Sequence, residues 1–472
     1  MSNDPLRIHL SLVSHTNIGK TTLARTLLSR DIGEVADRAH VTETTDDYVL
    51  ARNAEGCELV LWDTPGFGNS VALAKRLEGR ANPVGWFLSE VWDRMANKSL
   101  WLNQKALKHV KETSSVVLYL VNATELPDSA PYVSAEMRIL EWIGKPVIVL
   151  LNQIGQPKPP EAEQADVDRW KHAMAAYPIV SSVLSMDAFA RCWVQEFALF
   201  DAISKALPEE QQSTLEALRE VWSRQRRAAY NSSIQALAHY LEKLANDREV
   251  AESSSVMDQI KFLGKRLGLF KNETIHDPLG AAQTALSARA ADEFCALTDK
   301  LIAVNGLKGK GVRKELLRRM QTDWKVTSSV PPAPAAVAGA IGTGAAGGLA
   351  SDLATGGLSL GLGTLIGTVV GALGGAGLAV AYNHKKGIEG TVVTWSDQAL
   401  KKFFVEATLL YLAVAHFGRG RGNWEEGEYP EHWRTNIDAI LTDENITASE
   451  ISKYFDPIIR RVLSRLYPSA NF

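Results

Sequence analysis

The stretch SHTNIGKTTL, residues 14–23, follows the apolar run RIHLSLV and decides how the first half of the chain is interpreted. A phosphate-binding loop usually reads G-x-x-x-x-G-K-[ST], and Ser14 stands where the first glycine belongs. Such a loop binds phosphate through backbone N–H groups that lead into a helix N-terminus, so a serine at its first position removes no contact. The stretch is a candidate phosphate loop that needs support from elsewhere in the chain.

Short apolar runs alternate with amphipathic stretches throughout residues 6–208. Several runs are nearly continuous in Val, Ile and Leu, a composition typical of strands buried on both faces. The alternation predicts an α/β domain over residues 1–208, with a mostly parallel sheet, helices on both faces and a helical insert at 70–114. The expected strands lie in RIHLSLV, DDYVLAR, CELVLWDTP, SVVLYLVNA, PVIVLLNQ and YPIVSSVLS.

Two further motifs stand at the ends of predicted strands. LVLWDTPG places Asp63 at the end of one strand and Gly66 three residues later. This D-x-x-G pattern holds magnesium through water and senses a γ-phosphate by a backbone N–H. PVIVLLNQIG places Asn152 at the carboxyl end of another strand, where α/β sheets bind their ligands. The order of the three motifs is that of a P-loop GTPase domain, whose chemistry is phosphoryl transfer to water.

The phosphate loop assigns a role to each residue of its G-K-T triplet. Gly19 is the position where the backbone comes closest to the phosphates. Lys20 supplies positive charge to the β- and γ-phosphates, and the Thr21 hydroxyl is the expected direct magnesium ligand. Asp63 is expected to hold the same Mg²⁺ ion, and Gly66 to couple the γ-phosphate to the segment that follows it.

The segments SHTNIGKTT, TETTDD and WDTPGFGN resemble the Era and TrmE branch of bacterial GTPases over about the first 190 residues. The whole chain is similar to Era-like GTPases that carry a C-terminal domain of unknown function. The resemblance implies GTP and GDP as ligands, with Mg²⁺. Asn17 occupies the position at which TrmE-type enzymes coordinate K⁺, and Phe67 stands where Ras-like proteins have a catalytic glutamine. The resemblance therefore implies slow hydrolysis that is assisted by K⁺ or by a homodimer.

The segment between the first two motifs departs from the family pattern. The family's T-T-R-D appears here as residues 44–47, Thr-Thr-Asp-Asp, without the arginine. Thr45 is the expected second magnesium contact, and Thr42 and Thr44 stay open as alternatives. By this resemblance the catalytic residues are Lys20, Thr45 and Gly66, and the magnesium ligands are Thr21, Thr45 and Asp63.

The base site departs further, because the family's N-K-x-D reads Asn-Gln-Ile-Gly at residues 152–155. Gly155 lacks the carboxylate that accepts the N1–H and N2–H groups of guanine, so selectivity against adenine is an open question. Asp187 is either a substitute carboxylate or, as we favour, a helix N-cap, and Glu78 is interpreted as an ordinary exposed charge. The predicted nucleotide-binding residues, including two in the base-contacting loop position, are Ser14, Asn17, Ile18, Gly19, Lys20, Thr21, Thr22, Asn152, Gln153, Ser185 and Met186.

The second half of the chain has a helical pattern over residues 209–326, which predicts a helical domain. Thr327–Ser351 and Leu353–Asn383 then carry no charge and number 25 and 31 residues, each long enough to span a bilayer core. Glycines in one four-residue register, at 363, 367, 371 and 375, allow a second helix to approach closely. With basic clusters at both outer ends, 327–383 is predicted to form a membrane-contacting hairpin, the alternative being a soluble packing device; 384–472 is predicted to be a C-terminal helical segment.

Composition excludes several function classes. A net charge of −3 over 472 residues gives no general attraction to nucleic acid, and no RNA-binding motif is present. Three widely spaced cysteines exclude a disulfide framework, and the first residues lack a signal peptide. Both observations favour a cytoplasmic protein, and the predicted hairpin places it at the inner membrane. The predicted function is a GTPase whose nucleotide state controls a membrane-associated helical module. The alternative is a non-hydrolysing switch or scaffold that acts through a protein partner, and an RNA-binding Era-like GTPase is the less favoured third interpretation.

Overall fold

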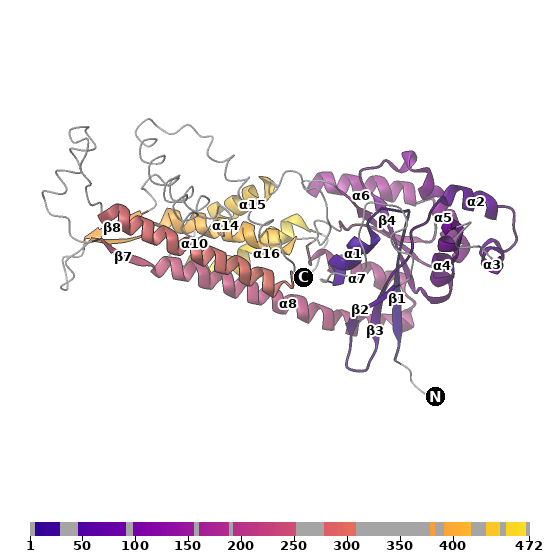
Figure 1. Cartoon of the computed structure of the whole chain (residues 1–472), viewed down its shortest axis with the longest axis horizontal. Helices are drawn as coiled ribbons and strands as arrows, with labels where there is room; N and C mark the ends of the chain where they lie inside the picture. Colours follow the sequence, from indigo (N-terminus) through magenta and orange to yellow (C-terminus); the bar gives the residue numbers. More distant parts are fainter. Residues whose placement is uncertain are drawn as a thin grey trace. The chain divides into compact units, whose positions relative to one another are not determined.

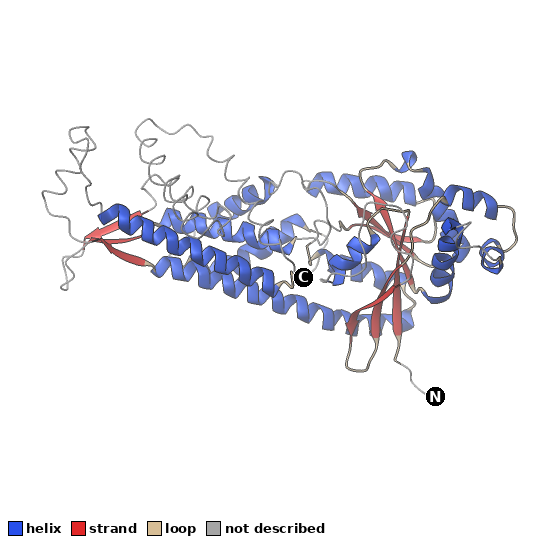
Figure 2. Cartoon of the chain, viewed as in Figure 1, coloured by secondary structure: helices blue, strands red, loops and turns tan. Residues whose placement is uncertain are grey.

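The computed structural model describes residues 5–28, 46–90, 98–154, 160–187, 192–251, 278–307, 378–382, 391–416, 431–443 and 450–468. The chain divides into two compact units. The first comprises Met1–Tyr230, Ala415–Trp424 and Leu463–Phe472, and the second comprises Asn231–Val414 and Glu425–Val462. Each unit contains its own sheet, as Figure 2 shows for the strands drawn in red.

The described part of the first unit contains a six-stranded sheet of order β2-β3-β1-β4-β5-β6. All six apolar runs form strands, as predicted, and only β2 runs antiparallel to its neighbour β3. Because the other five strands are parallel, their carboxyl ends lie along one edge. The strands are β1 (Arg7–Ser14), β2 (Asp46–Arg52), β3 (Glu58–Asp63), β4 (Val116–Asn122), β5 (Val147–Asn152) and β6 (Val180–Ser185).

Helices cover both faces of this sheet (Figure 1), which confirms the predicted α/β fold. One apolar core lies between the sheet and α1 (Lys20–Leu28), α7 (Gln195–Ala206) and the first part of α8 (Glu209–Asn246). The other core lies against the opposite face and involves a larger group of helices. They are α2 (Ser70–Leu77), α3 (Pro83–Ser89), α4 (Lys98–Thr113), α5 (Pro131–Ile143) and α6 (Pro160–Met174).

The second unit is mainly helical, as predicted for the C-terminal region. Its aromatic contacts include the stacked rings of Phe404 and Phe455, whose centroids lie 4.2 Å apart. Arg434 donates a 2.8 Å hydrogen bond to the largely buried carboxylate of Glu406. The helices are the end of α8, α10 (Pro278–Val304), α14 (Asp397–Ala415), α15 (Glu431–Asp443) and α16 (Phe455–Leu466).

The second unit also contains a small antiparallel sheet that the sequence did not indicate. Its order is β7-β9-β8, formed by β7 (Arg248–Ala251), β8 (Leu378–Tyr382) and β9 (Thr391–Trp395). The prediction of a helical hairpin over 327–383 is therefore wrong for Leu378–Tyr382. That segment pairs along its length with the β-branched Thr and Val residues of β9, a composition that favours strands.

The rest of the predicted hairpin, residues 327–377 and 383, lies outside the described residues. Within the part of the chain that is described, no helix is both long enough and apolar enough to cross a membrane.

Candidate nucleotide-binding site

The loop between β1 and α1 has the backbone conformation that its glycine predicts. Gly19 has a φ of 101°, and Asn17 also lies in the left-handed region with a φ of 66°. A Cβ atom at Gly19 would lie 2.8 Å from Asn152 Nδ2, so no larger residue fits there. Lys20 is the first residue of α1, which places the loop at a helix N-terminus, where backbone N–H groups bind anions.

Ser14, the residue in place of the first glycine, binds the lysine of the loop. Its buried hydroxyl accepts a 3.1 Å hydrogen bond from Lys20 Nζ and donates a 2.6 Å bond to the carbonyl of His15. Burial lowers the pKa of Lys20, while the nearby Asp63 and Glu136 carboxyls act in the opposite direction. Lys20 thus has one neutral acceptor in the loop, which the more basic oxygens of a phosphate can replace.

Thr21 and Asp63, from the ends of α1 and β3, form the predicted magnesium pair. Thr21 Oγ1 donates a 2.5 Å hydrogen bond to Asp63 Oδ2. Asp63 is 3% exposed, and its Oδ1 has no hydrogen-bond partner among the described residues. Burial raises the pKa of Asp63 to about 6, against the opposing effects of the Thr21 bond and the Lys20 charge. A hydroxyl and a carboxylate with an unsatisfied oxygen fit Mg²⁺, which prefers oxygen ligands.

Other expected magnesium ligands stay untested. Thr42, Thr44 and Thr45 lie outside the described residues, so the second contact remains a prediction. The described parts of the chain contain no group of three or more His, Cys, Asp or Glu side chains that could hold a metal ion. Proteins commonly bind Mg²⁺ through one or two side chains together with substrate phosphates.

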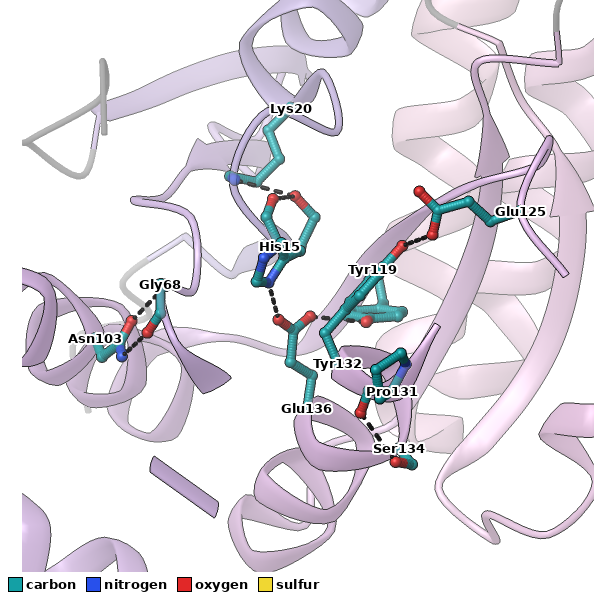
Figure 3. Close-up of polar contacts among 11 residues, drawn as sticks. His15, Lys20, Gly68, Asn103, Tyr119, Glu125, Pro131, Tyr132, Ser134 and Glu136 are labelled. Atoms are coloured by element: carbon teal, nitrogen blue, oxygen red, sulfur yellow. Dashed lines mark hydrogen bonds and ion pairs between the residues drawn. The ribbon is translucent and has the colours of Figure 1, made fainter. Parts of the chain in front are cut away.

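The segment after Asp63 is anchored on two sides. A Cβ atom at Gly66 would lie 3.0 Å from both Lys20 Nζ and the Thr16 Cα atom, so the backbone there approaches the phosphate loop closely. The next residue, Phe67, donates its N–H to the Ser14 carbonyl at 2.9 Å. Gly68 both accepts from and donates to the Asn103 side chain of α4, at 2.8 and 3.1 Å (Figure 3).

The ends of β5 and β6 carry the residues predicted to lie near a base. The buried Asn152 donates through Nδ2 to the Ile18 carbonyl at 2.6 Å, and Gln153 donates to the Asn17 carbonyl at 3.3 Å. Both amides therefore hold the phosphate loop. Thr22, the remaining residue expected to bind nucleotide, is buried in α1.

Asp187 follows β6 and makes a contact that was not expected. Its Oδ2 accepts a 2.6 Å hydrogen bond from the backbone N–H of Ile154, and the residue is 4% exposed. Asp187 does not cap α7, whose N-cap residue is Val194. Residues 188–191, directly after Asp187, lie outside the described residues, so the N-cap interpretation stays a prediction there. The Oγ atom of Ser185, the last residue of β6, is buried without a hydrogen-bond partner in the described chain, and Met186 after it is fully buried.

A buried carboxylate that contacts His15 of the phosphate loop was missed by the sequence analysis. Glu136 of α5 is fully buried, 2.8 Å from His15 Nδ1, and accepts a 2.7 Å bond from the Tyr119 hydroxyl (Figure 3). The His15 ring stacks on Tyr132 with 4.6 Å between centroids. The available signal was an acidic residue on the apolar face of a predicted helix. Glu78, by contrast, forms an exposed ion pair with Arg138, as expected for an ordinary surface charge.

Comparison with protein families agrees with this geometry. Residues 9–153 match the family described as "50S ribosome-binding GTPase", and residues 328–450 match a "Domain of unknown function (DUF3482)". The chain therefore contains a P-loop GTPase domain, and a C-terminal domain of unknown function follows it. None of the curated proteins matches this GTPase.

Solved structures that resemble the GTPase include Era in complex with MgGDPNP and nucleotides 1506–1542 of 16S ribosomal RNA. That match has 16% identity and a TM-score of 0.33, and covers 53% of this chain and 75% of that one. An Aquifex aeolicus Era variant bound to GDP·AlF4⁻ matches with 14% identity and a TM-score of 0.32, over 62% and 89% of the two chains. A variant of SsGBP matches with 15% identity and a TM-score of 0.24, over 46% and 57%. Similarities this low carry no argument about activity.

Proposed function

We propose that this chain binds GTP with Mg²⁺ at the β1–α1 loop, hydrolyses it slowly to GDP, and uses the bound nucleotide to control its C-terminal domain. One observation carries the proposal. The buried Asp63 is bonded to the Thr21 hydroxyl and keeps a second oxygen without a partner among the described residues. An uncompensated carboxylate costs folding free energy, so it is best explained by a cationic ligand that satisfies it.

Each residue of the site has its own proposed role in phosphoryl transfer. Lys20 and the N-terminal backbone N–H groups of α1 neutralise phosphate charge, which is the main catalytic requirement for this reaction. Thr21 and Asp63 would hold Mg²⁺, which supplies further positive charge between the phosphates. Gly66 leaves room for its backbone to face the γ-phosphate. Phe67 has no polar group with which to orient a water molecule, so we expect slow turnover.

A K⁺ ion is our proposal for what assists the slow reaction. It rests on Asn17, which matches the K⁺-coordinating position of TrmE-type enzymes, has a left-handed backbone in the loop and accepts a bond from Gln153 through its carbonyl. The alternative source of assistance is a second GTPase domain in a homodimer.

Nucleotide titration of the full chain tests the proposal. Lys20→Ala should weaken binding of labelled GDP and of a non-hydrolysable GTP analogue at least about a hundredfold in Mg²⁺, because the buried phosphates lose their principal cation. Lys108→Ala, which removes an exposed lysine of α4, is the matched control and should bind like the parent. Equal affinities of parent and Lys20→Ala would show that the β1–α1 loop is not the phosphate site.

The second candidate function is a nucleotide-dependent switch or scaffold that binds GTP, does not hydrolyse it and acts through a protein partner. Two residues favour it: Phe67, which cannot orient water, and Gly155, which lacks the family's base-binding carboxylate. Release of inorganic phosphate from GTP over many turnovers separates the candidates. Turnover that depends on Lys20 supports the enzyme, and stable GTP occupancy without release supports the scaffold.

Contact of the C-terminal domain with a membrane is a proposal supported by sequence alone, namely the two uncharged stretches on either side of Asp352 within residues 327–377 and their glycine register. It places the protein in the cytoplasm at the inner membrane. Flotation with liposomes, in GDP and in a GTP analogue, tests it against a deletion of 327–377. Binding by the parent alone supports membrane contact, and no binding with either nucleotide contradicts it.

RNA binding is less favoured, given the net charge of −3.

A further inference from the structure

We propose that Asp187, from the end of β6, supplies the carboxylate that recognises guanine in place of the acidic residue missing at Gly155. This inference rests on the proposed function, because it assumes that the phosphates of a nucleotide bind at the β1–α1 loop. It adds what that function leaves open, namely how this chain selects its base.

Strand order indicates where the base of a bound nucleotide lies. Along the sheet, β4, β5 and β6 follow β1 as successive parallel neighbours. Since neighbouring strands are about 4.8 Å apart, the ends of β5 and β6 lie about 10 and 14 Å from the end of β1. A nucleotide that extends across these strand ends from its phosphates brings its base to β5 and β6. The Asn152–Ile18 and Gln153–Asn17 hydrogen bonds join the β5 end to the phosphate loop as one continuous site.

The Asp187 carboxylate contacts the backbone directly before the position that should carry the missing acid. Met186 donates its N–H to the Leu151 carbonyl at 2.9 Å, so the two strands stay paired up to Asp187. Asp187 Oδ2 then accepts from the N–H of Ile154, the residue directly before Gly155. A long-range contact across 33 positions thus brings an acidic group from β6 to the turn after β5.

Asp187 is about as deeply buried as Lys20 and Asp63, the charged residues at the phosphate end of the site. Asp187 is 4% exposed, compared with 7% for Lys20 and 3% for Asp63. The hydroxyl of Ser185, two residues earlier, is buried with no hydrogen-bond partner in the described part of the chain. The β6 end therefore contains the buried Asp187 and the buried Oγ atom of Ser185, and the latter has no partner in the described part of the chain.

The chemistry of a carboxylate at this place selects guanine. Guanine presents two adjacent donors, N1–H and the exocyclic N2–H₂, and a carboxylate offers two acceptor oxygens with about four lone-pair sites. The carboxylate can accept from the base in addition to the protein groups that it contacts, the Ile154 N–H among them. Adenine presents an acceptor at N1 and no amino group at C2, so it would leave the buried carboxylate facing another acceptor. Such a mismatch is rejected strongly because the polar group of the site stays unpaired.

Replacing Asp187 with asparagine tests the assignment through base preference. Asparagine substitutes an N–H₂ donor for one acceptor, and xanthine presents a carbonyl at C2 where guanine has its amino group. Competition binding in Mg²⁺ with the full chain should therefore show that Asp187→Asn binds GDP about 10- to 100-fold more weakly and XDP more tightly than the parent does. Asp168→Asn, which changes an exposed aspartate of α6, should leave every affinity unchanged.

The parent chain provides a measurement that does not depend on the variant folding. IDP lacks only the 2-amino group, so the parent should bind IDP about tenfold or more weakly than GDP. If Asp187→Asn lost GDP, XDP and IDP binding equally, Asp187 would only hold the loop in place. If binding were unchanged, Asp187 would neither hold the loop nor recognise the base. Either result overturns the inference. A parent that binds GDP through Lys20 but does not distinguish GDP from IDP also overturns it, while the proposed function survives. A parent that binds no nucleotide removes both.

Discussion

The two ends of the nucleotide site differ in how they depend on the sequence motifs. At the ends of β1 and β3, Lys20, Thr21 and Asp63 meet as the motifs imply, with a 2.5 Å bond between the last two. At the ends of β5 and β6 the motif is incomplete, and the acidic group in that turn is Asp187 from the next strand. Phosphate binding uses local backbone N–H groups, whereas base recognition uses side chains that a neighbouring strand can also supply.

The largest effect is expected from Asp63→Asn, which tests the magnesium half of the phosphate end. The variant keeps the shape of the side chain and removes the charge that balances the cation, so Mg²⁺ should no longer strengthen nucleotide binding. We expect about a hundredfold weaker binding of a GTP analogue in Mg²⁺. In EDTA the variant and the parent should bind alike. A similar loss in EDTA would show that Asp63 contacts the phosphate loop rather than a metal ion.

A several-fold effect is expected from the monovalent cation. If K⁺ assists the reaction at Asn17, phosphate release from GTP is faster in K⁺ than in Na⁺ at matched ionic strength. Asn17→Ala should remove that difference while leaving nucleotide affinity within about threefold, because the phosphates are bound by Lys20 and the backbone. Equal rates in the two salts would exclude this mechanism and leave a homodimer as the source of assistance.

A feature could be predicted from the sequence when the residues that form it lie in one short segment of the chain. The strands and the G-K-T and D-x-x-G elements are local patterns, and the parallel sheet brings them to one edge, so Thr21 and Asp63 could be paired in advance. The Glu136–His15 contact spans 121 positions and the Asp187–Ile154 contact spans 33, and neither has a local periodic signature. Strand β8 was also missed, because its Gly- and Ala-rich surroundings obscure a segment that becomes a strand by pairing with β9.

A smaller effect is expected from pH, and it arises at a histidine that packs against β1 and β3. His109 of α4 lies 2.9 Å from the Ser11 hydroxyl of β1 and 4.4 Å, between ring centroids, from Trp62 of β3. Burial, followed by the effect of His9, lowers its pKa from 6.5 to about 4. Between these values the unfolded chain takes up a proton that the folded chain does not, so the free energy of unfolding falls as the pH decreases.

Urea denaturation at pH 7.5 and pH 5 measures this loss. The contribution of His109 should be about 1 kcal/mol, because solvent screening reduces the effect for a half-buried group. His109→Gln should decrease the difference between the two pH values by that amount, and His172→Gln, at an exposed site on α6, should not. The same pH difference in His109→Gln and in the parent would assign the pH effect to other groups.

The smallest effect concerns Ser14, the residue that replaces the first glycine of the phosphate loop. Ser14→Ala deprives Lys20 of the hydroxyl that accepts its hydrogen bond in the buried site, which should lower the free energy of unfolding by about 1 kcal/mol without nucleotide. Affinity for GDP should stay within about threefold of the parent, or rise slightly, because phosphate oxygens replace Ser14 as the acceptor for Lys20. Ser134→Ala, at an exposed position of α5, is the control for both measurements. A tenfold or larger loss of GDP affinity would contradict the comparison between the phosphate end and the base end of the site. Phosphate binding would then depend on one side chain, Ser14, as strongly as we infer that base binding depends on Asp187.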